Sequence, residues 1–121
     1  MEDADILAFV GATVKSVWAL ELLLLMRHER CRAWHVPQLV RELRASTLVV
    51  AEALKGLQST GLVATDETGE WCYRPASEQL DAFVEGAESL YAAKPVAVIN
   101  AIATAPSEKL RIFAEAFRLK D

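Results

Sequence analysis

Residues 37–62 read PQLVRELRASTLVVAEALKGLQSTGL and carry the clearest structural signals in the chain. It contains two helical patterns separated by a short break. Pro37 favours the start of a helix, because a proline in the first turn loses no hydrogen bond. Residues 38–44 continue this first, short helix. Its apolar side chains recur at helical spacing and are expected to face inward: Leu39, Val40 and Leu43.

A second helix is predicted over residues 47–59, after a turn at Ala45 and Ser46. Ser46 is a residue type that caps helix N-termini through its hydroxyl. Gly61 stands where helices end in the left-handed conformation. The side chains expected to face inward from this helix are Val50, Leu54 and Leu57.

A strongly apolar helix is predicted before this stretch, from Thr13 to Arg27. A short apolar run over residues 6–10 precedes it and stops near Gly11. The stripe that includes Val14 and Trp18 is broadened by leucines on most faces, which is typical of a central or interfacial helix. Residues 27–35 are polar and are expected to form a loop.

The sequence pattern is no longer helical after Gly61. Residues 62–65 and 71–74 are predicted strands on either side of a turn cluster, which together form a β-hairpin. Helices are then predicted over residues 77–93 and 96–104, with a last one starting near Ser107. The expected class is therefore mainly α with a small β-hairpin.

This order resembles the winged helix-turn-helix domain of small dimeric bacterial transcriptional regulators. The residues that carry the resemblance are Pro37–Leu43, Ser46, the pattern Val50-x3-Leu54-x2-Leu57-x3-Gly61-Leu62, and a wing over Val63–Tyr73. The resemblance covers about residues 14–75. It implies a winged helix-turn-helix in residues 1–75 and a C-terminal helical extension in 76–121, packed together as one compact domain.

The resemblance also implies a DNA-binding surface, because such domains insert the third helix into the major groove. The positions that match this surface are Arg41, Arg44, Thr47, Leu48, Lys55 and Arg74. The carboxylate of Glu52, on the same helix as Lys55, would repel the phosphates of DNA. The wing tip carries three more such carboxylates: Asp66, Glu67 and Glu70. The implied function is a transcriptional regulator with a weak DNA-binding surface.

The charge distribution keeps duplex DNA among the candidate partners. Five arginines and two glutamates give residues 27–44 a local charge of +3, which leaves −7 for the rest of the chain. A cluster of this kind is either a flank that binds phosphate or an ordinary solvated face.

An alternative is a winged-helix module that binds a protein and does not bind DNA. Leu48 and Val49, beside Glu52, would give the third helix an apolar stripe that fits a protein groove. The competing interpretation is that Leu48 or Val49 packs inside the domain.

A homodimer is expected, because the first helix and the helices after the hairpin carry more apolar side chains than the winged core can bury. The residues expected at its interface are Leu20, Leu23, Leu24, Phe83, Leu90, Ile99, Phe113 and Phe117.

Composition excludes several classes of protein. A chain of 121 residues with 53% apolar side chains and a net charge of −4 is neither disordered nor strongly basic. Two cysteines, Cys31 and Cys72, are too few for a disulfide scaffold. The acidic N-terminus and the lack of a 20-residue apolar run predict neither a secretion signal nor a membrane segment, so we expect a cytoplasmic protein.

Enzymatic and metal sites are not expected. His28, Cys31, His35 and Cys72 are possible metal ligands, but His-x2-Cys-x3-His matches no familiar zinc pattern and arginines crowd this loop. The sequence has no phosphate-binding glycine loop and no nucleophile elbow, which predicts a non-enzymatic protein without cofactors. Two carboxylate pairs have the spacing of a solvated helix face: Glu78 with Asp81, and Glu85 with Glu88.

Four aromatic residues have two interpretations. Trp18, Trp34, Trp71 and Tyr73 could line an effector pocket between the wing and the helices. Packing in the core and across the hairpin is the competing interpretation.

Overall fold

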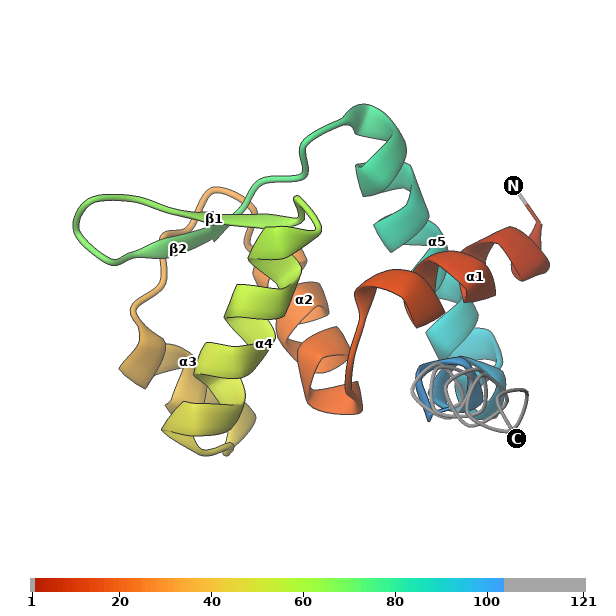
Figure 1. The fold of residues 1–121 in the computed structure, drawn as a ribbon, viewed down its shortest axis with the longest axis horizontal. Coiled ribbons are helices and arrows are strands. Elements are labelled where there is room, and N and C mark those ends of the chain that lie inside the picture. The colour runs from red at the N-terminus through yellow and green to blue at the C-terminus, as the bar shows by residue number, and fades with distance from the viewer. Residues whose placement is uncertain (1, 104–121) are drawn as a thin grey trace, which may run out of the picture.

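The computed structural model of the chain describes residues 2–103 and is mainly helical (Figure 1). The elements of this part are α1 (Asp3–Thr13), α2 (Val17–His28), α3 (Val36–Leu43), α4 (Thr47–Ser59), β1 (Val63–Thr65), β2 (Trp71–Tyr73) and α5 (Glu78–Ala93). Residues 95–103 are helical as well. The predicted class, mainly α with a small antiparallel hairpin, is confirmed. The helix predicted from Ser107 lies outside the described residues.

Helix α2 occupies the centre of the molecule (Figure 1), as its apolar sequence predicts. Helices α3 and α4 and strand β2 all contact it. Since its apolar side chains point in many directions, several neighbours are needed to keep them from water. The buried side chains are Ala19, Leu20, Leu22, Leu23, Leu24 and Met26.

The start of α2 differs from the prediction. The chain forms a separate helix, α1, which continues through Gly11, and α2 begins only at Val17. The hydroxyl of Ser16 caps α2 by accepting a hydrogen bond from the backbone N–H of Ala19 at 3.1 Å. The two helices are bent by 107° at their link, in which Val14 is buried. The prediction of one helix from Thr13 was therefore wrong.

The turn between α3 and α4 follows the predicted pattern. Helix α4 has the predicted bounds, and the Ser46 hydroxyl accepts a hydrogen bond from the N–H of Val49 at 3.1 Å. Helix α3 starts at Val36, one residue before Pro37, and the side chain of Gln38 accepts a hydrogen bond from the N–H of His35 at 2.8 Å. Arg44 ends α3 in the left-handed conformation, with φ of 55°. This conformation is unfavourable for a residue that has a Cβ.

The hairpin is antiparallel, with Val63 opposite Tyr73, and Gly61 precedes it in the predicted left-handed conformation. Trp34, in the segment predicted as a loop, forms a β-bridge with Trp71. The N–H of each residue donates to the carbonyl oxygen of the other at 2.7 Å. This bridge attaches the hairpin to the segment between α2 and α3. A single paired residue leaves no alternating pattern, so the sequence did not predict it.

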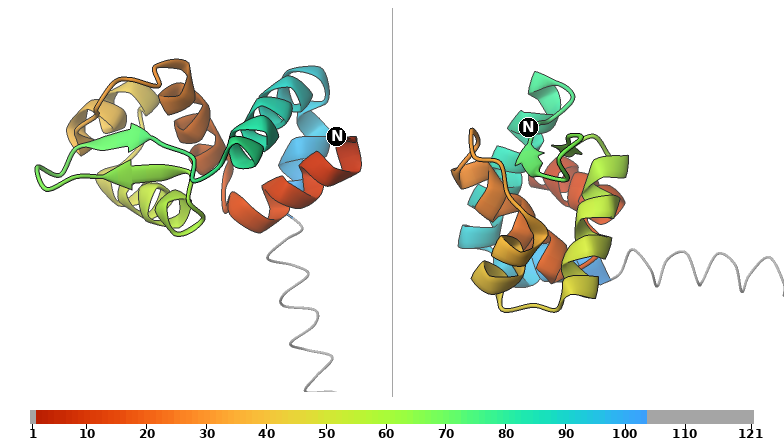
Figure 2. Two further views of the ribbon diagram at one scale, coloured as in Figure 1. Left: turned by 90° about the horizontal axis from the view of Figure 1, so that it is seen from above. Right: turned by 90° about the vertical axis from the view of Figure 1, so that its left-hand side faces the viewer.

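The helices form two groups, which are best separated in Figure 2. Helices α2, α3 and α4 lie with the hairpin, whereas α1 lies beside α5 and the helical residues 95–103. The rings of Phe9 in α1 and Phe83 in α5 stack with centroids 5.0 Å apart. Helix α1, which precedes the predicted division at residue 75, therefore packs on α5, which follows it. One hydrophobic core nevertheless runs through both groups, from Ile6 to Ile102.

No single helix among residues 2–103 has the length and apolar character needed to cross a membrane. Helices α1 and α2 meet those two criteria only as a bent pair.

Two glycines offer a matched test of the backbone. Gly61→Ala is expected to destabilise the fold by about 1–2 kcal/mol, because the left-handed conformation disfavours a Cβ. That Cβ would also lie 3.2 Å from the Cβ of Ala76. Gly56→Ala, within α4 and with nothing within 4 Å of the new Cβ, is expected to stabilise it by about 0.5–1 kcal/mol. Urea unfolding measures both variants, and shifts of the same sign would contradict this account.

Candidate nucleic-acid interface

Helix α4 presents a mixed face to solvent. Its buried residues are Val50, Ala53, Leu54 and Leu57, on the side that packs on α2 and α3. The residues of this helix that were assigned to the DNA surface, Thr47, Leu48 and Lys55, are exposed, as are Ala51 and Glu52. Leu48 is 68% exposed, so the interpretation that it packs inside the domain is wrong. Val49 is half-buried. The face therefore combines one hydroxyl, one cation, one carboxylate and a large apolar side chain.

Four cationic side chains of the predicted DNA surface have no ion pair within the described part of the chain. Arg41 lies on α3, Arg44 at its C-terminal end, Lys55 on α4, and Arg74 directly after β2. All four are exposed. The structure thus leaves every basic residue of the predicted DNA surface accessible to an external anion.

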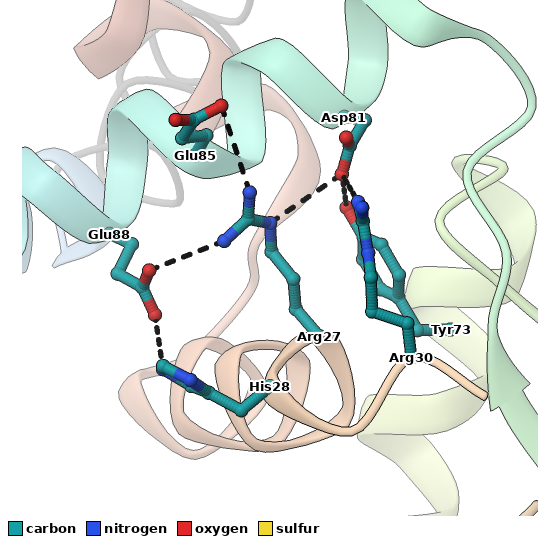
Figure 3. Close-up of polar contacts among 7 residues, drawn as sticks. All are labelled: Arg27, His28, Arg30, Tyr73, Asp81, Glu85 and Glu88. Carbon is teal, nitrogen blue, oxygen red and sulfur yellow. Dashed lines mark hydrogen bonds and ion pairs between the residues drawn. The ribbon is translucent and has the colours of Figure 1, made fainter. Parts of the chain in front are cut away.

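The other arginines of the basic stretch are used within the fold. Arg27, at the end of α2, reaches toward α5 (Figure 3). Its nitrogens lie 3.5 Å from Asp81, 3.8 Å from Glu85 and 3.3 Å from Glu88. The side chain of Arg27 is only 16% exposed. Arg32 pairs with Glu29 at 3.2 Å. The stretch from 27 to 44 is therefore not one basic patch, because its first half is neutralised by partners.

Asp81 is the meeting point of this network. It accepts hydrogen bonds from the guanidinium of Arg30 and from the hydroxyl of Tyr73, the latter at 2.6 Å (Figure 3). The hydrogen bond from Arg30, followed by that from Tyr73, lowers the pKa of Asp81 below its ordinary value. Burial, with the hydrogen bond to Asp81, raises the pKa of Tyr73 to about 12. The ionised carboxylate therefore links α5 to the end of α2 and to the hairpin.

Sequence reasoning missed the role of the α5 carboxylates, which it assigned to a solvated helix face. Asp81, Glu85 and Glu88 are spaced by four and three residues, so they share one face of the helix. That spacing could have indicated a cationic partner. Only the packing of α5 on the end of α2 shows that the partner is Arg27.

The tip of the hairpin is acidic and internally ordered. The carboxylate of Asp66 accepts hydrogen bonds from the N–H of Thr68 at 2.9 Å and of Glu70 at 3.2 Å, and also from the Thr68 hydroxyl. The hydroxyl bond is the main cause that lowers the pKa of Asp66. Glu67 is exposed beside it. The tip therefore carries negative charge and repels phosphate.

The residues expected at a dimer interface divide into three groups. Leu20, Leu23 and Leu24 are buried among the chain's own elements, so their assignment to an interface is corrected: α3, α4 and β2 already cover α2. Leu90 is buried as well, and Phe83 stacks on Phe9. Ile99 is 37% exposed. Phe113 and Phe117 lie outside the described residues.

The four aromatic residues do not gather at one pocket. Trp34 and Tyr73 are buried, and Trp34 pairs with Trp71, which favours the packing interpretation for these three. Trp18 is 44% exposed and lines a hollow of about 250 Å³ between the start of α2 and α4. Of the two interpretations given for Trp18, packing in the core is therefore wrong.

Cys31 and Cys72 form no disulfide, and the first is exposed and the second half-buried. Within residues 2–103, no group of three or more His, Cys, Asp or Glu side chains is placed to hold a metal ion. His28 instead pairs with Glu88, and His35 lies 3.7 Å from Glu70.

No protein-family model, curated protein or solved structure matches this chain.

The Asp81 network gives the stability a defined pH dependence. The carboxylate is stabilised when ionised, so its contribution is present above its ordinary pKa of 3.8 and is lost as the pH falls through the lowered value. We expect Asp81→Asn to lower the free energy of unfolding by about 1.5–3 kcal/mol at neutral pH, the range of a hydrogen bond to a charged group. The difference from the unsubstituted chain should shrink in acid.

Urea unfolding over a pH series measures this difference. Glu67→Gln is the matched control, since it removes an exposed carboxylate without a hydrogen bond or ion pair among residues 2–103. A difference for Asp81→Asn that stayed constant down to the lowest pH would contradict the assignment.

Proposed function

We propose that this chain is a non-enzymatic winged helix-turn-helix regulator that binds duplex DNA through α4 and the turn before it. The observation that carries the proposal is the division of the basic residues. Arg27, Arg30 and Arg32 have carboxylate partners, whereas the cations around α4 have none among the described residues. Exposed cations without partners are the groups that bind phosphate and release counterions.

The arrangement suggests a division of labour within the surface. Arg41 and Arg44 are placed to contact phosphates beside the groove, which fixes position without reading sequence. Thr47 and Leu48 occupy the first turn of α4, from which helix-turn-helix domains contact base edges. A threonine hydroxyl can bond several bases, and a leucine fits the methyl group of thymine. The surface therefore favours weak binding with modest sequence preference.

The acidic hairpin tip limits the role of the proposed wing. Asp66 and Glu67 would repel phosphate, so the wing contributes mainly through Arg74 at its base. With about four phosphates neutralised, the slope of log affinity against log salt is expected near −3 to −4.

We also propose that the protein is bacterial, is located in the cytoplasm and forms a homodimer. Because the other elements of the same chain cover α2, we assign the dimer interface to the helices after the hairpin. Val96 and Ile99, with exposed fractions of 68% and 37%, support this choice of surface.

Arg44→Gly tests the DNA interface without straining the fold. The substitution removes the guanidinium and relaxes the left-handed backbone, so the free energy of unfolding should stay equal or rise. Affinity for a random duplex should fall about three- to tenfold at low salt, and the salt slope should flatten by about 0.9. Fluorescence anisotropy across a salt series measures both quantities.

Lys94→Ala is the control for this experiment. Lys94 pairs with Asp3, and both residues lie in the group formed by α1 and α5, not in the group that carries α4. It should leave DNA affinity unchanged. Absence of binding by the unsubstituted chain at low salt would refute the proposal.

A second candidate function is a protein-binding module, favoured by the exposure of Leu48. A leucine that is 68% exposed at the start of α4, beside half-buried Val49, fits an apolar groove on a partner. Glu52 lies on the same helix and suits a partner with a basic rim.

Leu48→Asp distinguishes this second function. We expect it to abolish binding of the partner and to change the free energy of unfolding by less than about 0.5 kcal/mol, as for other exposed positions. Lys55→Ala, also on the exposed face of α4, should leave that binding intact. Unfolding of the Leu48 variant would show instead that the side chain supports the core.

A further inference from the structure

Trp18 is a large aromatic side chain that is partly exposed on the surface. It lies in the first turn of α2 and is 44% exposed, although most of this helix is enclosed. The hollow of about 250 Å³ on one side is floored by apolar parts of α4, including Val49 and Leu57. Gly56 keeps this hollow open, since a Cβ there would meet nothing within 4 Å. Val17 and Leu43 line a second hollow beside the same indole.

Carboxylates surround this apolar surface. Glu52 lines the first hollow, and Glu21 and Glu42 line the second. All three residues are exposed. Lys15 is the one base among the residues that line the two hollows. We refer to Trp18 and the two hollows together as the groove. Its base is apolar, and carboxylates line its edge, which we call the acidic rim. A groove of this kind fits an apolar segment flanked by basic residues.

The chain itself contains such a segment outside the described residues. Residues 107–120, drawn on a helical wheel, bring one apolar stripe together: Leu110, Phe113 and Phe117. Two bases flank the stripe on each side, Lys109 with Lys120 and Arg111 with Arg118. Glu108 and Glu115 fall on the opposite face. A helix of this length spans about 21 Å, close to the length of α4.

The end of the described chain lies close to this groove. In Figures 1 and 2 the helical residues 95–103 end near the link between α1 and α2. Thr13 and Ser16 of that link line the first hollow. Residues 104–106 can span about 10 Å between this end and the following segment.

We propose that residues 107–120 dock as an amphipathic helix in the groove of the same chain, with Phe113 and Phe117 against Trp18 and the four bases facing the acidic rim. The contact covers the exposed indole and one edge of α4. It uses the C-terminal segment within one molecule, whereas the sequence alone suggested a role in a dimer interface.

Trp18 reports directly on this contact in the full chain. Trp34 is buried and Trp71 is half-buried, so both respond weakly to a quencher in water. The difference in acrylamide quenching between the unsubstituted chain and Trp18→Phe isolates the signal of Trp18.

The double variant Phe113→Glu and Phe117→Glu should raise the quenching constant of Trp18 about twofold, because the indole loses its apolar cover. Leu119→Glu makes the same chemical change on the opposite side of the helical wheel and should leave quenching unchanged. Glu42→Lys, which reverses charge on the rim, should expose Trp18 in part.

Three outcomes would overturn the proposal. Equal quenching in the unsubstituted chain and the double variant would show that the segment does not cover Trp18. Shielding that appears only at high protein concentration would assign the segment to a second copy. Shielding that appears only with anionic phospholipid vesicles would assign it to a membrane surface. Shielding that is independent of concentration and lost in the double variant supports docking within one chain.

Discussion

The apolar surface of α2 is the constraint on which the other elements depend. Six buried side chains on one short helix require neighbours on several sides, and α3, α4 and β2 supply them. Burial of this kind contributes roughly 1.5–3 kcal/mol for each large apolar side chain, far more than an exposed ion pair. The cover is incomplete at both ends of the helix. Trp18 remains exposed at the first, and Arg27 emerges from the core at the second.

The two ends of α2 have different consequences. At the C-terminal end, Arg27 is held by three carboxylates of α5, which connects the helix group that carries α4 to the group formed by α1 and α5. A largely buried arginine needs such partners, because its desolvation is costly. At the N-terminal end, an apolar side chain lies beside a groove with an acidic rim. One end therefore stabilises the assembly of the chain, and the other offers a surface for docking.

Charge is distributed by the same packing. Arg27 and Arg30, near the end of α2, pair with carboxylates of α5, and Arg32 pairs with Glu29. Arg41 and Arg44, on α3 and at its C-terminal end, have no such partner among the described residues. The sequence shows the arginines as one cluster because it orders them only along the chain. Folding separates them into a structural set and an exposed set. The proposed DNA surface is what remains after the structural set has been neutralised, which is why we expect weak binding.

Local chemistry made the region from α3 to the hairpin predictable from the sequence. A proline, a serine cap and a left-handed glycine act within a few residues, so α4 and the turn before it follow directly from the printed letters. Contacts between distant residues could not be predicted in this way. The bridge between Trp34 and Trp71, the grip of α5 on Arg27 and the exposure of Trp18 each depend on which elements meet in space. The turn before α4, the bounds of α4, its outward face and the hairpin were predictable from the sequence, since these follow from local backbone and side-chain preferences. The pairing of the cations and the burial of the leucines follow from tertiary packing, because both depend on partners far along the chain.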